Sequence, residues 1–281
     1  MAKKKSTKAK TSVKKATEEK VTTPEVKKAK VVASNKSVSS DLFDKVIKEV
    51  AQPQYIVRLV AELIGTFLLA SVVIATQGQP IGVFFGITAV VLMVGALSGA
   101  HINPAITLGA WATKKIKTIP AVGYIVAQVL GAMLSFVLIS AFINAAPSVS
   151  EQAAQFGQQA PKLFTASPIP EGKEMLVMWA EFIGMSIFAF GVSAVAKKKA
   201  DSAVAFGVGG SLFVALLIAG STSAILGASS IFNPAIAVAL QAFTIEGTNT
   251  AWAIATYVGA ALLGGVFGFG LETVLSRYNK K

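Results

Sequence analysis

Long hydrophobic stretches separated by short polar segments dominate this chain from residue 55 onward. Six stretches are long and apolar enough to cross a bilayer, and we expect helices near residues 55–76, 80–98, 119–143, 175–196, 202–224 and 250–272. Two further hydrophobic segments, which begin at residues 103 and 233, extend for only about ten residues each. A segment of that length is too short to span and is typical of a half-helix that enters and leaves the membrane on one side.

Both short segments begin with the same tripeptide: Asn103-Pro104-Ala105 and Asn233-Pro234-Ala235. Asn is a preferred N-cap and Pro suits the first helical position, so each tripeptide predicts the start of a helix. A helix that starts at membrane depth has N–H groups without intrahelical partners, and these must face protein or a water-filled path. Two such starts favour a pore.

An internal repeat relates the two halves of the chain. Ala61-Glu62-Leu63-Ile64-Gly65 begins the first half and Ala180-Glu181-Phe182-Ile183-Gly184 begins the second, and each is followed by two more spans with a half-helix between them. Because three spans per half is an odd number, the second half must enter the membrane from the opposite face. We therefore expect an all-α membrane protein with six transmembrane helices and two re-entrant half-helices in an inverted 3+3 repeat, over residues 55–143 and 175–272.

Charge is concentrated outside the expected spans. Residues 1–40 hold 12 Lys and 3 Glu, and this low-complexity composition predicts a disordered tail. An amphipathic surface helix is expected over residues 41–54 and a short tail over residues 275–281. Lysines or arginines also follow the first half-helix and the fourth and sixth spans, so six spans place the basic segments on one side, with both termini in the cytoplasm. No aromatic residue interleaves the N-terminal lysines, so we expect a solvated tail that enforces topology and binds no nucleic acid. Attraction to anionic lipid or to nucleic acid is the alternative.

At these motifs the chain resembles the aquaporin and glycerol-facilitator family, also called the major intrinsic proteins. The resemblance covers residues 55–274 and rests on the two Asn-Pro-Ala tripeptides, the two Ala-Glu-x-Ile-Gly motifs and the segment from Ser98 to Gly109. It implies an aquaporin-like channel domain over residues 55–274 that passes water or small neutral solutes such as glycerol. It also implies a plasma-membrane location and a homotetramer in which each protomer has its own pore, and it implies no cofactor.

The resemblance further implies roles for individual residues. Asn103 and Asn233 are expected to donate to a passing water from two opposed helix N-termini, whose positive dipole ends raise the barrier for cations. Glu62 and Glu181 are expected to accept hydrogen bonds from the re-entrant loops, since a carboxylate inside a membrane needs partners; a proton relay is the alternative. His101 is expected in the vestibule as a hydrogen-bonding neighbour of the first half-helix, with pH sensing as the alternative.

One position departs from the family pattern. The family usually carries Arg directly after the second Asn-Pro-Ala, where this chain has Ile236. Counting back from each Asn gives the other constriction positions: Val83, Ser221 and Ser230. A short gap would instead give Phe85 for the first and Gly220 for the second. This set carries no charge, so we expect a wider and less polar constriction than that of a strict water channel, with weaker exclusion of protons and small cations.

Three other classes of protein remain as alternatives. An ion-coupled secondary transporter on an inverted repeat needs ionisable groups at the midplane, and only Glu62 and Glu181 are available. A membrane enzyme needs a nucleophile–base pair or a metal cluster, and with one His and no Cys we expect neither an enzyme nor a metal site. A non-conducting scaffold on the same fold is separated from a channel by a permeability measurement.

Overall fold

The computed structural model describes residues 43–148, 150, 152, 155–157 and 159–279. The tail predicted over residues 1–40 lies outside the described residues, as do the first two residues of the surface helix predicted over 41–54. Within that predicted helix, residues 43–50 are helical. The chain divides into two units, residues 1–48 and 49–281, and every element below belongs to the second.

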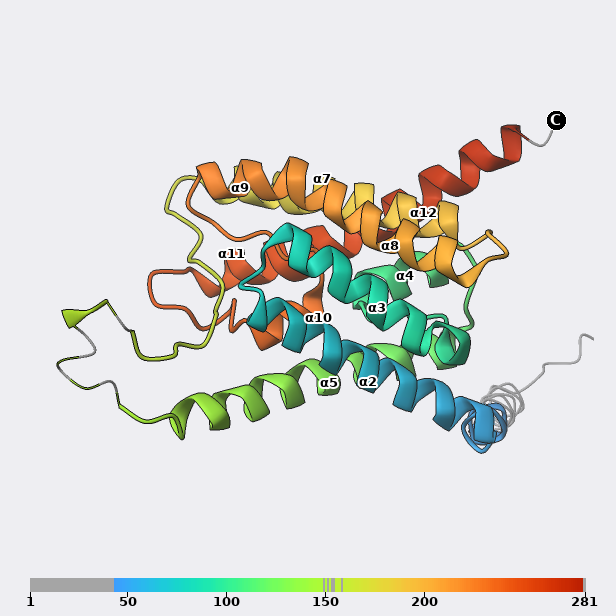
Figure 1. Cartoon of the computed structure of the whole chain (residues 1–281). Helices are drawn as coiled ribbons and strands as arrows, with labels where there is room; N and C mark the ends of the chain where they lie inside the picture. The colour runs from blue at the N-terminus through green and yellow to red at the C-terminus, as the bar shows by residue number, and fades with distance from the viewer. Residues whose placement is uncertain (1–42, 149, 151, 153–154, 158, 280–281) are drawn as a thin grey trace, which may run out of the picture. The chain divides into compact units, whose positions relative to one another are not determined.

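Within the described residues, six helical segments are long and apolar enough to cross a membrane (Figure 1): Pro53–Ala75 (α2), Pro80–Ser98 (α3), Thr118–Asn144 (α5), Glu174–Val195 (α7), Asp201–Ile225 and Thr250–Tyr278. They match the six predicted spans, although the last one extends to Tyr278 rather than ending near residue 272. The residues that the structure describes contain no strand. The predicted all-α membrane fold with six spans is confirmed.

The fifth and sixth spans are each built from three segments. In the fifth, η1 (Leu216–Gly220) separates α8 (Asp201–Ala215) from α9 (Ser221–Ile225). In the sixth, η2 (Ala255–Ala260) separates α11 (Thr250–Ile254) from α12 (Ala261–Tyr278). Both η1 and η2 are π-helices, whose wider i→i+5 turns interrupt the regular hydrogen-bond ladder and are frequent at functional sites.

Two short helices, α4 (Pro104–Ala112) and α10 (Pro234–Ala239), correspond to the predicted half-helices. Each packs against the last span of the other half, α4 against α12 and α10 against α5. The first contact is close because it is made at glycines: a Cβ added to Gly109 would lie 2.5 Å from the carbonyl oxygen of Gly265. The two half-helices thus make equivalent contacts, each with the last span of the other half, as the internal repeat predicts.

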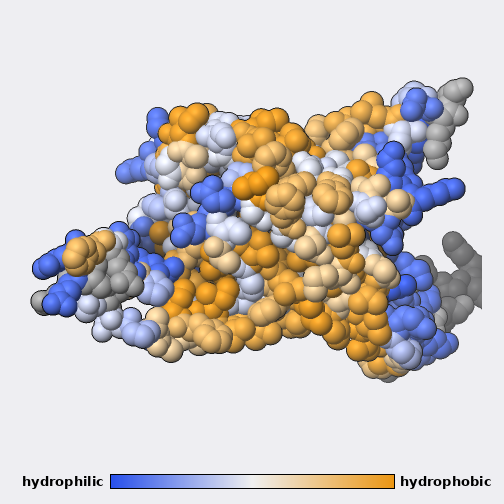
Figure 2. All heavy atoms as spheres, in the orientation of Figure 1, coloured by the Kyte–Doolittle hydropathy of each residue, from blue (hydrophilic) through white to orange (hydrophobic). Residues whose placement is uncertain are grey.

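The connections define two ends of the helical bundle. Lysines follow α4 and α7 at one end, which we call the basic end; they are Lys114, Lys115, Lys117 and Lys197–Lys199. The turn at residues 76–79 and residues 159–173, which precede α7, lie at the opposite end, which we call the loop end. Figure 2 shows a broad band of hydrophobic residues over the helices, with hydrophilic residues gathered toward the ends. The band provides the apolar surface that helices facing lipid need.

Candidate channel site

The N-termini of α4 and α10 are capped in the same way. Asn103 and Asn233 are both extended, and the Oδ1 of each accepts a hydrogen bond from the backbone N–H two residues later, at 2.8 Å and 3.0 Å. Pro follows each Asn at the first helical position, where its missing N–H costs nothing. Each tripeptide therefore starts a helix for the reason that the sequence indicates.

The two caps also bond to each other's loops. Asn103 Nδ2 donates to the carbonyl oxygen of Phe232 at 2.8 Å, and Asn233 Nδ2 donates to the carbonyl oxygen of Ile102 at 3.0 Å. An amide nitrogen carries two protons, so one remains on each Asn. For Asn103 the Sδ of Met185, a weak acceptor, lies 4.0 Å away. The two half-helices thus meet end to end through a reciprocal pair of hydrogen bonds.

Strained backbone precedes each cap. Ile102 has φ of 42° and Phe232 has φ of 54°, in the left-handed region that β-branched and bulky residues avoid. Both side chains are fully buried. Such a conformation persists only where the surroundings fix it, and here the carbonyl of each residue accepts from the Asn of the other half while its N–H is held by a buried carboxylate.

Those carboxylates are Glu62 and Glu181. Glu62 accepts four hydrogen bonds, from Ser98 Oγ (2.6 Å), His101 N (2.9 Å), Ile102 N (2.7 Å) and Gln128 Nε2 (2.7 Å). Glu181 accepts two, from Ile231 N (3.1 Å) and Phe232 N (2.5 Å). Both side chains have no exposed surface. Each carboxylate therefore lies where it supports the re-entrant loop of its own half.

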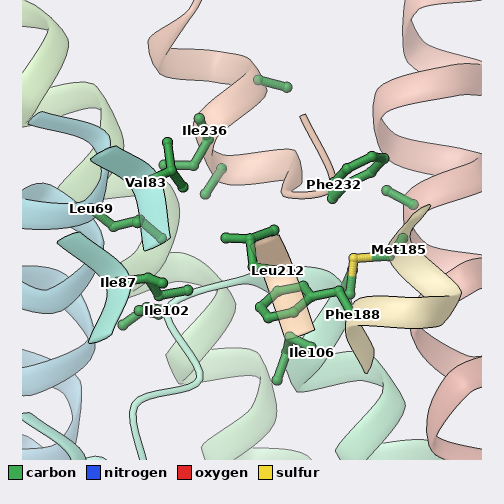
Figure 3. Close-up of a cluster of buried hydrophobic side chains, with 14 of the residues drawn as sticks. Leu69, Val83, Ile87, Ile102, Ile106, Met185, Phe188, Leu212, Phe232 and Ile236 are labelled. Carbon is green, nitrogen blue, oxygen red and sulfur yellow. The ribbon is translucent and has the colours of Figure 1, made fainter. Parts of the chain in front are cut away.

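A cavity of about 290 Å³ runs along the meeting point of the halves. Asn103 and Asn233 line it, and most of the remaining lining residues are hydrophobic: Leu69, Val73, Pro80, Val83, Ile87, Ala100, Ile102, Ile106, Phe164, Phe188, Val192, Val208, Leu212, Leu216, Ala224, Ala228, Ile231, Phe232, Ile236 and Leu240. Figure 3 shows several of them around the centre of the bundle. The cavity offers a few polar groups near its middle within an apolar wall.

All four residues predicted for the constriction line this cavity, toward the loop end: Val83, Ser221, Ser230 and Ile236. Val83 and Ile236 lie near each other in Figure 3, and Ser230 Oγ lies 2.8 Å from Ser223 Oγ. Gly220 lines the cavity as well, beside Ser221. Phe85, the alternative to Val83, is 59% exposed on the outer surface of α3, so that alternative is wrong.

His101 lies toward the basic end of the same cavity. Its backbone N–H donates to Glu62, its Nδ1 is 3.2 Å from Thr107 Oγ1 on α4, and its ring meets Tyr124 edge-on at 5.3 Å. The imidazole thus lines the cavity and is held there by contacts with α4 and α5, as a hydrogen-bonding neighbour of the first half-helix.

The comparisons with known proteins agree with this geometry. The family model described as "Major intrinsic protein" matches residues 73–199. Aquaporin Z of Photorhabdus laumondii is 28% identical over 241 residues, which cover 78% of this chain and 96% of that relative. Aquaporin AqpM of Methanothermobacter marburgensis is 28% identical over 255 residues, which cover 79% of this chain and 96% of that relative.

This chain belongs to the major intrinsic protein family. The aquaglyceroporin structure from Plasmodium falciparum has the same fold, with a TM-score of 0.59 at 19% identity, and the match covers 80% of this chain and 98% of that one. Members of the major intrinsic protein family are channels, so this chain is a multi-pass membrane channel and not an enzyme.

This major intrinsic protein also has a buried carboxylate, Glu272, paired with two partly exposed lysines. The sequence analysis missed it because it took Glu62 and Glu181 as the only carboxylates deep in spans. Glu272 on α12 is 5% exposed and accepts from Lys197 and, at 2.6 Å, from Ser193 Oγ. The ammonium of Lys115 lies 3.6 Å from the same carboxylate and donates to Ser193. Burial lowers the pKa of the Lys115 ammonium, and the Glu272 charge opposes that shift. The signal in the sequence was a lone Glu in the last span opposite two lysine clusters.

Proposed function

We propose that this chain is a passive channel for water and small uncharged solutes such as glycerol. The observation that carries the proposal is the meeting of two half-helix N-termini, with Asn103 and Asn233 exchanging hydrogen bonds on the wall of an otherwise apolar cavity. The names of similar proteins support it, since they include a water channel, Aquaporin Z, and a "Glycerol uptake facilitator protein-like 6" of Lactiplantibacillus plantarum, 38% identical over 96 residues that cover 31% of this chain.

Two opposed helix N-termini place about half a positive charge each at the centre of the lumen. This charge repels cations, hydronium included. The second amide proton of Asn233, and that of Asn103 when it exchanges its weak contact with Met185 Sδ for water, orient the oxygen of a passing water toward the caps. A water oriented from both sides breaks the hydrogen-bonded chain along which protons would move.

The constriction is formed in this proposal by Val83, Ser221, Ser230 and Ile236. Its only polar side-chain groups are two hydroxyls, and the hydroxyl of Ser230 lies within hydrogen-bond distance of Ser223. Ile236 stands where the family usually has Arg. We therefore propose a constriction that admits neutral solutes larger than water and that excludes protons and small cations less strictly.

The proposal includes the placement of the chain. Residues 55–274 form the channel domain, with both termini and the basic end in the cytoplasm, as the lysine distribution favours. Residues 1–40 and the end of the chain after α12 are cytoplasmic tails, and the helix over residues 43–50 is a surface helix. The membrane is the plasma membrane, and the assembly is a homotetramer with one pore in each protomer.

The test is stopped-flow light scattering of liposomes that carry the purified protein, with protein-free liposomes as the control. We expect faster shrinkage in sucrose and faster re-swelling in glycerol than in the control. Fast water flux without glycerol entry would limit the channel to water, and the absence of both would favour the scaffold. Entry that depends on an imposed proton or sodium gradient would instead favour the transporter.

A further inference from the structure

The segment of residues 159–173, which precedes α7, lies over the proposed constriction at the loop end. Three of its backbone N–H groups donate to the second half: Ala166 to the carbonyl of Leu240 (2.9 Å), Ser167 to Ser229 Oγ (2.8 Å) and Ile169 to Thr248 Oγ1 (3.2 Å). Ala166 and Ile169 are buried in the same interface. Residues 166–169 are therefore fixed along the end of α10 and the loops on either side of it.

Phe164 extends from this segment toward the first half. Its ring lies against the turn between α2 and α3, where a Cβ added to Gly78 would be 3.3 Å from Phe164 Cζ. Gly78 has φ of +68°, a conformation that suits glycine, and its missing side chain leaves the space that the ring occupies. Phe164 thus connects the two halves at the loop end.

Phe164 also lines the cavity that contains the proposed constriction. The four constriction positions supply two aliphatic and two hydroxyl side chains and no ring, so Phe164 is the largest side chain at that end of the cavity among its lining residues. A Phe ring is flat and rigid, and here it is supported from one side by the anchored segment and from the other by the turn at Gly78.

We propose that Phe164 determines the size of the solutes that this channel admits. The inference rests on the function proposed above. It places a first selection of solutes at the mouth of the channel, by which we mean the loop end of the cavity beside Phe164, before a solute reaches Val83 and Ile236. The ring narrows the mouth with an apolar face, so it admits compact neutral molecules and excludes longer or branched ones. Without the Phe164 ring, the proposed constriction would let the longer or branched molecules pass.

The experiment measures the permeability of liposomes to water, glycerol, erythritol and ribitol, for the wild type and three variants. Phe164→Ala opens the mouth, and Phe164→Trp narrows it. Leu163→Ala is the matched control, because Leu163 is the adjacent residue on the same segment and packs against the core without lining the cavity.

We expect Phe164→Ala to raise erythritol and ribitol permeability on the order of tenfold, the discrimination that small steric changes in apolar pockets give. Water permeability should change far less, Phe164→Trp should lower glycerol permeability, and Leu163→Ala should keep the wild-type size limit. An unchanged size limit in both Phe164 variants, with a conducting wild type, would overturn this inference alone. A wild type that conducts neither water nor glycerol would overturn the proposed function as well.

Discussion

The two halves of the channel share a repeat and differ in how they are built. In the first half, α2, α3 and α5 are uninterrupted helices, and Glu62 receives four hydrogen bonds, two of them from side chains on α3 and α5. In the second half, two spans contain the π-helices η1 and η2, and Glu181 receives two hydrogen bonds, both from backbone. The first half thus has regular helices joined by side-chain hydrogen bonds to Glu62, and the second half has two spans interrupted by π-helices.

The two π-helices lie beside residues that line the cavity or hold the segment over it. η1 ends at Gly220, directly before Ser221, and both line the cavity. η2 carries Tyr257, whose hydroxyl donates at 3.2 Å to the carbonyl of Ser229, the residue that also holds the segment of Phe164. We infer that the first half supplies a rigid frame and that the second half, by local departures from the α-helix, shapes the mouth.

The largest effect that tests this difference is expected at the two carboxylates. Replacing Glu by Gln exchanges one carboxylate oxygen, which accepts hydrogen bonds, for an amide NH₂ group, which donates them. Each oxygen of Glu62 accepts two hydrogen bonds and each oxygen of Glu181 accepts one. The change therefore leaves two donors without their acceptor at residue 62 and one at residue 181. We expect Glu62→Gln to lower the free energy of unfolding by about 3–5 kcal/mol and Glu181→Gln by about 1–3 kcal/mol. Thermal unfolding in detergent measures both. Equal losses of unfolding free energy in the two variants would contradict the inference that the first half forms the rigid frame and the second half shapes the mouth.

The next effect concerns Ile236 and Ile106, which stand at the same place after the two Asn residues and both line the cavity. Ile236→Arg adds a fixed positive charge at the constriction and should lower proton flux at least about tenfold, because a unit charge a few ångströms away costs a cation about 1–4 kcal/mol. Glycerol permeability should fall too, since the longer side chain fills the lumen.

Ile106→Val and Ile236→Val serve as controls for the altered packing at each position, and proton flux into liposomes with a pH-sensitive dye is the measurement. Equal proton flux in the wild type and in Ile236→Arg would remove the proposed link between the missing arginine and cation leakage.

A smaller effect is expected at the link between the halves near the basic end. Lys115 follows α4 of the first half and bonds to Ser193 on α7 and Glu272 on α12 of the second. Because the Glu272 side chain is 7% exposed, Lys115→Met should cost about 1–3 kcal/mol of unfolding free energy. The control is Lys117→Met: the Lys117 side chain is 82% exposed and pairs with Glu49 at 3.8 Å, so its loss should cost about 0–1 kcal/mol. A similar cost for both would show that the pairing of Lys115 with Glu272 adds no more than a surface ion pair.

The smallest effect compares two tyrosines in corresponding spans. Tyr124 donates to the carbonyl of Ser98 at 2.8 Å, and Tyr257 donates to that of Ser229 at 3.2 Å. Each Tyr→Phe change should cost about 0.5–1.5 kcal/mol. Only Tyr257→Phe should alter the ratio of erythritol to water permeability, because Ser229 anchors the mouth segment. A changed ratio in Tyr124→Phe instead would reverse the roles of the halves.

The six spans and both helix starts could be predicted because their signals are local. The thickness of the bilayer sets the length and apolarity of a spanning helix, so a span can be recognised from its own residues. Asn and Pro start a helix through contacts within two residues of their own position. The four positions predicted for the constriction were found by counting from each Asn, and all four line the cavity. Their role as a constriction stays a prediction.

Other features could not be predicted, because their partners are far apart in the chain or oppose local preference. Ile102 and Phe232 adopt positive φ against their own propensity, and only the carboxylates and the opposite Asn explain it. Glu272 is buried because two lysines from other connections reach it. Phe164 lies in a segment with no periodic pattern, held by bonds that span 62 and 79 residues.

The exchanged bonds between the two caps have a consequence for biosynthesis. The acceptor for Asn103 lies 129 residues downstream, so at ribosomal speeds the first half-helix waits roughly ten seconds before that carbonyl has been made. During this interval the nascent loop depends on Glu62, whose four donors all come from residues 98–128 and are already present. A chain released early would therefore retain an ordered first half and have no lumen.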